Sequence, residues 1–331
     1  MATRQTSAAI ERVWSQLPEG AREVLESELS PTDLQSLLLS LAQTRARRIH
    51  PADALRRWKS DRFVRPAPVD PGWLSEVENR LWQQLRTTPF VGLALSPVTP
   101  LGTCTSVGAV DQNRIVSTMR SSEVVSDPCN VLALEAALRR RSGVDQVHLA
   151  SCHRVLRAQR FADSNAFAHF VIFALVSSAR DSGTARTEAQ LLIMHLSFWQ
   201  QVLDDLLGAS WGRFAYTQID NQSIGERLVD AIQSEFPEAP LTEYPERTQG
   251  IGYYHNAAFK IMAKTETNEL EIGDGGFVRW TAELIPDAKE RCLISCVAPE
   301  RIAGLMRKPN VWPPRESIPR ILGSTRSGGE T

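Results

Sequence analysis

The sequence predicts an α+β fold, in which helices flank an antiparallel β-sheet and an all-helical segment precedes them. Two apolar runs, residues 147–161 and 167–178, are separated by a polar turn and are typical of neighbouring antiparallel strands. A second pair, FKIMAK at residues 259–264 and ELEI at residues 269–272, alternates apolar and polar positions as a hairpin does. Strands and helices do not alternate as regular βαβ units, which disfavours a doubly wound parallel sheet.

The composition is that of an ordinary globular protein, with 42% hydrophobic and 23% charged residues among 331. A chain of this length builds one large domain with an appendage, or two domains. The formal net charge of −1 argues against a polyelectrolyte that binds nucleic acid or membrane with its whole surface. No apolar run approaches the ~20 residues that span a bilayer, and charges interrupt the N-terminal stretch where a signal peptide needs an apolar region. We therefore expect a cytoplasmic location.

The first part of the chain, residues 8–63, is predicted to be helical. Ser30 is placed to cap a helix that has Pro31 at its first position and Asp33 near its positive end. Basic residues gather in the second half of this segment and indicate either a solvated helix face or a docking patch for an acidic partner. The cluster comprises Arg45, Arg47, Arg48, Arg56, Arg57, Lys59, Arg62 and Arg65.

A proline-rich connector, VRPAPVDPG at residues 64–72, gives the clearest domain boundary. We expect a helical N-terminal domain over residues 1–68 and a core over residues 69–308. Residues 309–331 are rich in proline, serine and glycine, which indicates an extended or disordered tail.

Three amphipathic helices are predicted in the core. They begin at Trp73, at Asp127 with Pro128 in the first turn, and at Thr187, and the third stops at Gly208. Residues 87–110, by contrast, mix β-branched residues, glycines and prolines and are predicted as extended segments around turns. The apolar stripes comprise Leu74, Val77, Leu81 and Leu85 in the first helix and Leu192, Leu196, Trp199, Leu203 and Leu206 in the third.

The five cysteines predict neither a disulfide framework nor a metal site. Their number is odd and they are widely scattered in a large chain. Cys152 beside His153, and Cys292 four residues before Cys296, both lack the C-x-x-C spacing of a zinc knuckle. The better interpretation is that the thiols are free and buried.

A glycine–tyrosine segment, GIGYYHNAAFK at residues 250–260, stands at the start of a predicted strand. Glycine permits backbone conformations and close approaches that a Cβ atom blocks. Neighbouring residues of a strand face opposite sides, so one tyrosine packs while the other points into a pocket. The plain alternative is a glycine turn into an ordinary strand with half-buried tyrosines.

Two further motifs suggest a family. LRAQRFADSNAFAHF, residues 156–170, has a strand with an arginine, a loop, and a return strand with an aromatic residue. SCVAPERIAGL, residues 295–305, has a strand that turns into a helix near an arginine. Together with the helix at 73–85 and an extended segment ending at Pro97, these resemble the catalytic core of class II aminoacyl-tRNA synthetases over residues 70–305. Within that class the histidyl type and its non-tRNA paralogs are the most similar.

The resemblance implies an ATP site. Arg157 would hold the α-phosphate and the substrate carboxylate, and Arg301 the γ-phosphate, because guanidinium groups bind oxyanions through paired hydrogen bonds. Phe170 would stack on adenine, and Gln159 occupies the place of a glutamate that reads the adenine amino group. Mg²⁺ would accompany ATP. The glycines usual before the second arginine are replaced by Val297, Ala298 and Pro299.

The resemblance also implies an amino-acid pocket. Gly250, Tyr253 and Tyr254 match the histidyl-type substrate loop, and the downstream segment DGGFVRW keeps both glycines of its family counterpart. Glu123, in TMRSSEVVSDP, matches the glutamate that binds the substrate amino group. Gln249 replaces the arginine that assists amino-acid activation, and Arg247 is close to it but out of register. The two retained glycines are Gly275 and Gly276.

Three functions follow from these observations. The leading one is a stand-alone enzyme that activates a small carboxylate, such as an amino acid, as its adenylate for transfer to an amine, a carrier protein or a tRNA. The acceptor would dock on the basic N-terminal helices, and the resemblance implies a homodimer. Too few residues follow Arg301 for the anticodon-binding domain of the family, so we expect no full tRNA charging. The alternatives are an inactive paralog that binds an effector, and nucleic-acid binding by the arginine cluster alone, which requires steep salt dependence.

Overall fold

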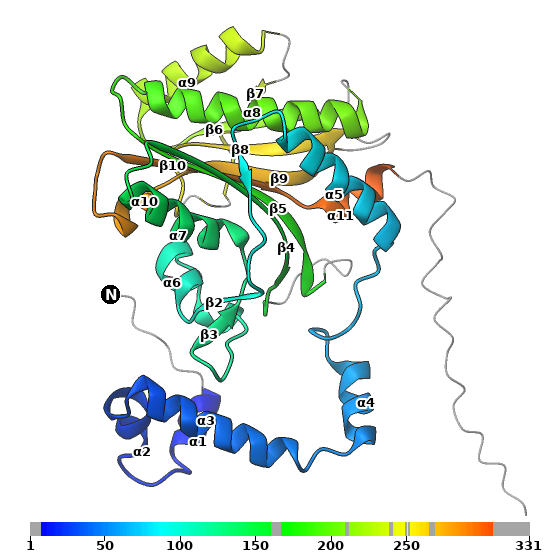
Figure 1. The fold of residues 1–331 in the computed structure, drawn as a ribbon, viewed down its shortest axis with the longest axis vertical. Helices are drawn as coiled ribbons and strands as arrows, with labels where there is room; N and C mark the ends of the chain where they lie inside the picture. Colours follow the sequence, from blue (N-terminus) through cyan, green and yellow to red (C-terminus); the bar gives the residue numbers. More distant parts are fainter. Residues whose placement is uncertain are drawn as a thin grey trace, which may run out of the picture.

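The computed structural model describes residues 8–159, 167–208, 212–237, 241–248, 250, 252–264 and 269–306. It confirms the predicted α+β class: a mainly antiparallel sheet is flanked by helices, and a helical stretch precedes it (Figure 1). The predicted tail over residues 309–331 lies outside the described residues. No helix in the described ranges is both long and apolar enough to cross a membrane.

The main sheet has eight strands in the order β1-β4-β5-β10-β9-β8-β6-β7. Its two edge pairs, β1 with β4 and β6 with β7, are parallel, and every other pair is antiparallel. The two hairpins predicted from sequence, β4–β5 and β8–β9, are confirmed. In sheet order the strands are β1 (Val91–Gly92), β4 (Gln146–Leu156), β5 (His169–Arg180), β10 (Glu290–Val297), β9 (Glu269–Val278), β8 (His255–Lys264), β6 (Gly212–Gln218) and β7 (Leu241–Glu243).

Residues 87–110 differ in part from the prediction of extended structure. β1 and β2 (Val98–Pro100) are extended, and β2 pairs with β3 (Ser122–Val124) in a small second sheet. The stretch Thr103–Gly108 is instead a short helix, α6. The buried Glu123 carboxylate accepts the N–H groups of Gly102 and Cys104, each at 2.8 Å, and satisfies donors that the helix start leaves unpaired. This long-range cap is not visible in the local sequence. A 3₁₀ turn, Gln112–Arg114, follows.

One face of the sheet, here called the closed face, is covered by α5 (Pro71–Leu85), α8 (Arg186–Leu207) and α9 (Gln222–Glu235) (Figure 1). The predicted stripe of α5 is entirely buried, and α8 buries its predicted stripe as far as Leu203, with Leu206 half-buried. Asp70 caps α5 and Gly208 ends α8, as the sequence indicates for α8. Each fully buried large apolar side chain contributes about 1.5–3 kcal/mol to folding.

The closed face also buries a chain of polar groups. His148 Nδ1 and His195 Nε2 each lie 2.8 Å from Ser177 Oγ, and His195 Nδ1 lies 2.7 Å from Ser295 Oγ. The indole of Trp199 donates to the same Ser295 hydroxyl at 2.8 Å. The sequence did not indicate this network. Burial lowers the pKa of His195 well below its ordinary value, and lowers that of His148, because a buried imidazole disfavours charge.

The opposite face, here called the cavity face, is covered by α7 (Pro128–Arg141) and α10 (Trp280–Leu284). The predicted start of α7 is confirmed: Asp127 caps it by accepting the N–H of Cys129 at 2.9 Å, and Pro128 is its first residue. A second apolar cluster fills the space between α7 and the sheet. The helices leave part of this face uncovered near α11 (Pro299–Met306), and a cavity lies there.

The N-terminal stretch is helical, as predicted, with short breaks. It comprises α1 (Ala8–Trp14), α2 (Ala21–Glu23) running into a π-helical turn (Val24–Glu28), α3 (Pro31–Ala46) and α4 (Pro51–Ser60). Ser30 caps α3 through the Asp33 N–H at 3.1 Å, and Pro31 is its first residue. None of these helices contains a buried residue, and Figure 1 shows them set apart from the sheet.

Candidate functional site

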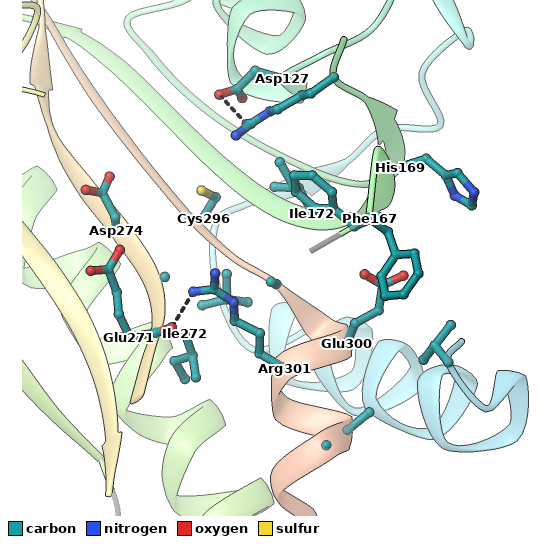
Figure 2. A pocket seen from close by; sticks show the side chains of 18 of the residues that line it. Asp127, Phe167, His169, Ile172, Glu271, Ile272, Asp274, Cys296, Glu300 and Arg301 are labelled. Atoms are coloured by element: carbon teal, nitrogen blue, oxygen red, sulfur yellow. Dashed lines mark hydrogen bonds and ion pairs between the residues drawn. The ribbon is translucent and has the colours of Figure 1, made fainter. Parts of the chain in front are cut away.

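The cavity face contains a cavity of about 570 Å³, within the ~300–1,000 Å³ range of small-molecule pockets. It lies against β5, β9 and β10, between the start of α7 and the start of α11, and the connector before α5 forms part of its wall (Figure 2). Its polar, thiol and aromatic lining residues are Asp70, Trp73, Asp127, Cys129, Arg157, Phe167, His169, Phe170, Tyr253, Tyr254, Glu271, Asp274, Ser295, Cys296, Glu300 and Arg301.

Arg157 follows the last residue of β4 and lies at one end of this cavity. Its Nε donates to the Ser126 carbonyl oxygen at 2.9 Å, and its guanidinium lies 3.6 Å from the Asp127 carboxylate. The guanidinium carbon is 5.2 Å from the centre of the Phe170 ring, a cation–π distance. The structure therefore brings Arg157 and Phe170, predicted as the α-phosphate and adenine residues, into one wall of the cavity.

Arg301 lies on the first turn of α11, across the cavity from Asp127 (Figure 2). Its Nη1 donates to the Glu271 backbone oxygen at 2.5 Å. Val297 and Ala298, which replace the family's glycines, line the cavity, and the Ala298 N–H is bonded to the Ile272 carbonyl at 2.9 Å. The cavity thus remains open in front of Arg301 despite the added side chains.

The glycine–tyrosine segment forms another wall. Gly250 has a φ of +75°, in the left-handed region, and its carbonyl accepts the N–H groups of Tyr253 and Tyr254. A Cβ at Gly276 would come within 2.5 Å of the Tyr254 ring, so that glycine makes room for the tyrosine. Tyr254 is buried, and Tyr253 is half-buried with its ring stacked on Trp280 at 6.2 Å. Both tyrosines line the cavity, and Gly250 and Gly276 position them there.

Asp274 of β9 connects this wall to a buried arginine. Its carboxylate accepts the Tyr254 hydroxyl and forms an ion pair with Arg247, whose side chain is completely buried. Burial raises the pKa of Asp274 above its ordinary value, and the Arg247 guanidinium limits that rise. Burial, and then the Asp274 charge, raise the pKa of Tyr254 well above its ordinary value. A carboxylate held in this way gives the pocket a fixed polar group deep in its wall.

Several predicted site residues lie elsewhere. Glu123 is buried away from the cavity lining, and its carboxylate is occupied by α6 and by Gln112 Nε2 at 2.9 Å. Hydrogen bonds from Cys104, Gln112 and Gly102 outweigh burial and lower its pKa. Gln159 is half-buried outside the lining. Gln249 lies outside the described residues. The structure therefore does not bring Glu123 to the substrate end.

The two retained glycines act through packing. A Cβ at Gly275 would meet the Phe259 ring at 2.5 Å and the Ile294 carbonyl oxygen at 2.8 Å, and Gly276 accommodates Tyr254. Neither residue lines the cavity, whereas their neighbours Gly273 and Asp274 do. The glycines predicted to bind substrate thus shape the wall that carries Asp274.

Sequence reasoning missed three parts of the site. Asp127 was interpreted only as a helix start, and Asp274 only as part of a glycine motif. Cys129 and Cys296, predicted as free and buried thiols, are buried and half-buried respectively, and both line the cavity. The third part is the connector: Ala67 and Pro68 lie in the cavity wall although they precede the predicted core, and Val69, the first residue of that core, lies there too. The position of Asp127 directly before Pro128 could have indicated a site residue, because it placed a carboxylate at a helix N-terminus.

Hydrogen bonds hold the connector in place. Arg62 donates from its two terminal nitrogens to the carbonyl oxygens of Ala158 (2.5 Å) and Gln159 (2.7 Å), and His169 Nε2 lies 2.6 Å from the Arg65 carbonyl oxygen. These contacts join the end of the helical segment to the strand ends that carry Arg157 and Phe170. The predicted boundary near residue 68 therefore falls inside the site.

No group of three or more His, Cys, Asp or Glu side chains among the residues described is arranged to hold a metal ion. Two carboxylates of β9 line the cavity, Glu271 and Asp274, and each is paired with a cation. Lys260 Nζ lies 2.8 Å from Glu271 Oε2. A divalent ion at this site would therefore need ligands from a bound substrate.

No protein-family model matches the chain, and no curated protein is similar to it in sequence. Solved structures share its fold. Apo S. aureus histidyl-tRNA synthetase aligns with a TM-score of 0.55 and 14% identity over 73% of this chain and 69% of that chain. An ATP phosphoribosyltransferase regulatory subunit/histidyl-tRNA synthetase from Bacillus halodurans C aligns with a TM-score of 0.53 and 10% identity over 74% and 83%.

A histidine–tRNA ligase subunit from Alicyclobacillus acidocaldarius aligns with a TM-score of 0.52 and 10% identity over 73% of this chain and 96% of that chain. At these identities the similarity shows the fold alone. The expected fold family is confirmed: the chain has the catalytic-core fold of class II aminoacyl-tRNA synthetases and is similar in structure to their histidyl-type members.

Proposed function

We propose that the protein is an ATP-dependent ligase that activates a small carboxylate, such as an amino acid, as its adenylate. The observation that carries the proposal is that Arg157, Phe170 and Arg301, far apart in sequence, line the same cavity as Tyr253 and Tyr254. One cavity thus has a wall suited to a nucleotide and a wall suited to a small polar molecule.

The proposed reaction is an in-line attack of the substrate carboxylate on the α-phosphorus of ATP, which forms the acyl–phosphate bond and releases pyrophosphate. Arg157 would stabilise charge at the α-phosphate, and Arg301 would bind the far end of the triphosphate. Phe170 would hold the adenine ring by stacking. Such a reaction needs mainly positioning and charge stabilisation from the protein, so replaced loop residues do not exclude it.

Mg²⁺ fits this cavity only together with ATP. Mg²⁺ commonly binds one or two carboxylates and the phosphates of its substrate. Glu271 is a cavity carboxylate whose backbone oxygen accepts a hydrogen bond from Arg301. Glu271 would therefore hold the ion, with a shift of its Lys260 partner. When bound, Mg²⁺ neutralises phosphate charge.

The substrate end would be formed by Tyr253, Tyr254 and Asp274. Because the Asp274 carboxylate is fixed by Arg247 and Tyr254, it is oriented before a ligand arrives. The surrounding wall of Ile172, Cys129 and Cys296 is apolar or weakly polar. This combination suits a small molecule with one polar group and a compact apolar part.

We further expect a homodimer through the face around β1 and β2. Val91, Val98 and Leu101 are exposed there, and Val98 lines a shallow groove together with the exposed Leu138 of α7. Exposed apolar side chains that cluster in this way are typical of interaction surfaces. The acyl acceptor remains a prediction: an amine, a carrier protein or a tRNA.

An effector-binding paralog without activity is the second candidate. Its supporting observation is that both arginines already have protein partners, Arg157 with Asp127 and Arg301 with the Glu271 carbonyl. Similarity to a protein described as an ATP phosphoribosyltransferase regulatory subunit/histidyl-tRNA synthetase agrees with either function. Under this alternative the tyrosine wall binds a small effector and ATP does not bind.

Pyrophosphate exchange into ATP tests the proposal. The proteinogenic amino acids are supplied as a pool and then singly, and Arg157→Ala is compared with Arg227→Ala, which removes an exposed arginine of α9. We expect exchange that requires one amino acid, falls at least ~100-fold in Arg157→Ala and is unchanged in Arg227→Ala. An amino acid that binds in calorimetry without any exchange or ATP binding would support the effector function instead.

A further inference from the structure

The N-terminal module, defined here as residues 8–60, exposes apolar surface that nothing in the described chain covers. Nine of the 17 exposed large apolar side chains in the described residues lie in this module, between Ile10 and Trp58. Its helices contain no buried residue. Leu37 and Leu41 lie one helical turn apart near the middle of α3 and are 39% and 52% exposed. A helical unit with no core of its own is stabilised when another surface covers such residues.

Charge is divided between the two ends of the module. Residues 8–33, the acidic end, contain six acidic and two basic residues, a net charge of −4. Residues 45–60, the basic end, contain six basic residues and one acidic residue, a net charge of +5. In the described part of the chain, Glu19, Glu23 and Glu28 form no ion pair within 4.0 Å, and neither do Arg45, Arg47 and Arg48.

The two ends are also separated in space. Figure 1 shows α1 and α2 gathered at the N-terminal end of α3, with α4 beyond its other end. A helix of 16 residues spans about 24 Å, so α3 holds the acidic and basic ends apart with the exposed leucines between them. The order along the module is acidic end, apolar middle and basic end.

We propose that the N-terminal module is a self-association surface that binds the same module of a second copy of this chain. An antiparallel, two-fold symmetric pair places each acidic end against the partner's basic end, and the apolar middles against each other. Such an interface is self-complementary, which is what two-fold symmetry requires. This contact is separate from the expected homodimer face around β1 and β2.

Charge complementarity favours a second copy over other occupants. Nucleic acid would match the basic end, but its phosphates would repel the acidic end. An acidic protein has the same mismatch. A second copy satisfies both ends at once and covers Leu37 and Leu41 with the equivalent leucines.

Charge reversal tests the pairing in the full chain. Glu19→Lys/Glu23→Lys/Glu28→Lys makes both ends basic, and Arg45→Glu/Arg47→Glu/Arg48→Glu makes both ends acidic. Each variant alone juxtaposes like charges, whereas a mixture of the two restores complementarity at both ends. The control, Glu226→Lys/Asp230→Lys/Glu235→Lys, reverses the same number of exposed charges on α9. Circular dichroism verifies that every variant is folded.

Sedimentation equilibrium measures the association. Because exposed ion pairs contribute about 0.2–1 kcal/mol each, we expect one association step of the unmodified chain to weaken at least ~10-fold in each triple variant. This association step should return in the equimolar mixture of the two triple variants, and it should be unchanged in the α9 control. A dimer formed by the core face persists in all variants, so it does not obscure the result.

Carbodiimide coupling identifies the ends that meet. The reagent joins a carboxylate to an amine with loss of water, and Lys59 is the only lysine of the module. In a mixture of ¹⁴N- and ¹⁵N-labelled chains, we expect mixed-isotope peptides that join Lys59 to glutamates of the acidic end. Unchanged sedimentation of both variants, or a mixture that stays dissociated, would overturn the proposal. So would bulk tRNA that binds the unmodified chain but not the Arg45/Arg47/Arg48 variant while self-association is unaltered.

Discussion

The two faces of the sheet use polar residues in opposite ways. On the closed face, His148 and His195 are both bonded to the Ser177 hydroxyl beneath α8, and His195 is also bonded to Ser295. On the cavity face, Arg157 and Arg301 line the cavity. Arg157 is held by the Ser126 carbonyl and the Asp127 carboxylate, and Arg301 by the Glu271 carbonyl. Strand β5 contributes to both faces, because neighbouring residues of a strand point to opposite sides. Within β5, Ser177 joins the network and Ile172 lines the cavity.

The two faces therefore differ in what a substitution changes: folding stability on the closed face and ligand binding on the cavity face. Substitutions on the closed face remove packing and leave buried polar groups unpaired, so they are expected to unfold the protein. Substitutions of the cavity arginines remove groups that are partly exposed and lightly bound, so they are expected to change ligand affinity with little cost in stability.

The largest expected effect is that of Trp199→Ala. The indole is fully buried, packs edge-on against Phe198 at 4.8 Å, and donates to the Ser295 hydroxyl. Its loss should lower the free energy of unfolding by about 3–5 kcal/mol, measured by urea denaturation. Trp58→Ala, at a 48% exposed position of α4, is the matched control and should change it by less than about 0.5 kcal/mol. Equal losses in the two variants would contradict a packed closed face.

Gly276→Ala tests the tyrosine wall. The new methyl group would lie 2.5 Å from the Tyr254 ring and 2.9 Å from the Ala257 carbonyl oxygen, so the wall must move. We expect a loss of about 1–3 kcal/mol in urea denaturation, because overpacking forces side chains from their preferred positions. Gly304→Ala on α11 meets nothing within 4 Å and should instead be neutral or stabilise the protein by up to about 1 kcal/mol. A neutral Gly276→Ala would mean that Tyr254 is not held as described.

The buried histidine network predicts a pH dependence. His195 is neutral in the folded protein because burial lowers its pKa, whereas an unfolded histidine has a pKa of about 6.5. The unfolded state therefore takes up the proton first, and stability is lost as pH falls below about 6.5, by up to ~1.4 kcal/mol per pH unit for each such histidine. Denaturation of His195→Gln over the same pH range should show a slope smaller by that amount. An identical slope in both proteins would show that His195 does not titrate in this way.

Much of the fold was predictable because it is encoded in short stretches of sequence. The stripes of α5 and α8 repeat every three or four residues, and Ser30, Pro31 and Gly208 end or begin helices by local rules. β4 and β5, like β8 and β9, are consecutive in the sequence and pair with each other. Helix α6 was missed because its cap, Glu123, comes from a strand beyond it.

The residues of the site were predictable only in part, because strand register and the pairing of distant side chains determine which residues line the cavity. The motifs identified Arg157, Phe170, Tyr253, Tyr254 and Arg301, and the structure brings these five together. Asp274 joins them through its pairing with Arg247, 27 residues away, and no local pattern shows that contact. The connector residues Ala67–Val69 belong to the site because Arg62 and His169 hold that segment across the strand ends. Contacts of this kind depend on the folded arrangement of the whole core.

The central claim is that the cavity face binds a ligand whereas the closed face stabilises the fold. Its most direct test is a calorimetric titration of ATP, with urea denaturation of the same samples. The unmodified chain should bind ATP at millimolar nucleotide or below, and Arg157→Ala should bind at least ~10-fold more weakly while its free energy of unfolding changes by less than about 1 kcal/mol. If ATP does not bind at millimolar concentration, or binds both proteins equally, the cavity face is not a nucleotide site.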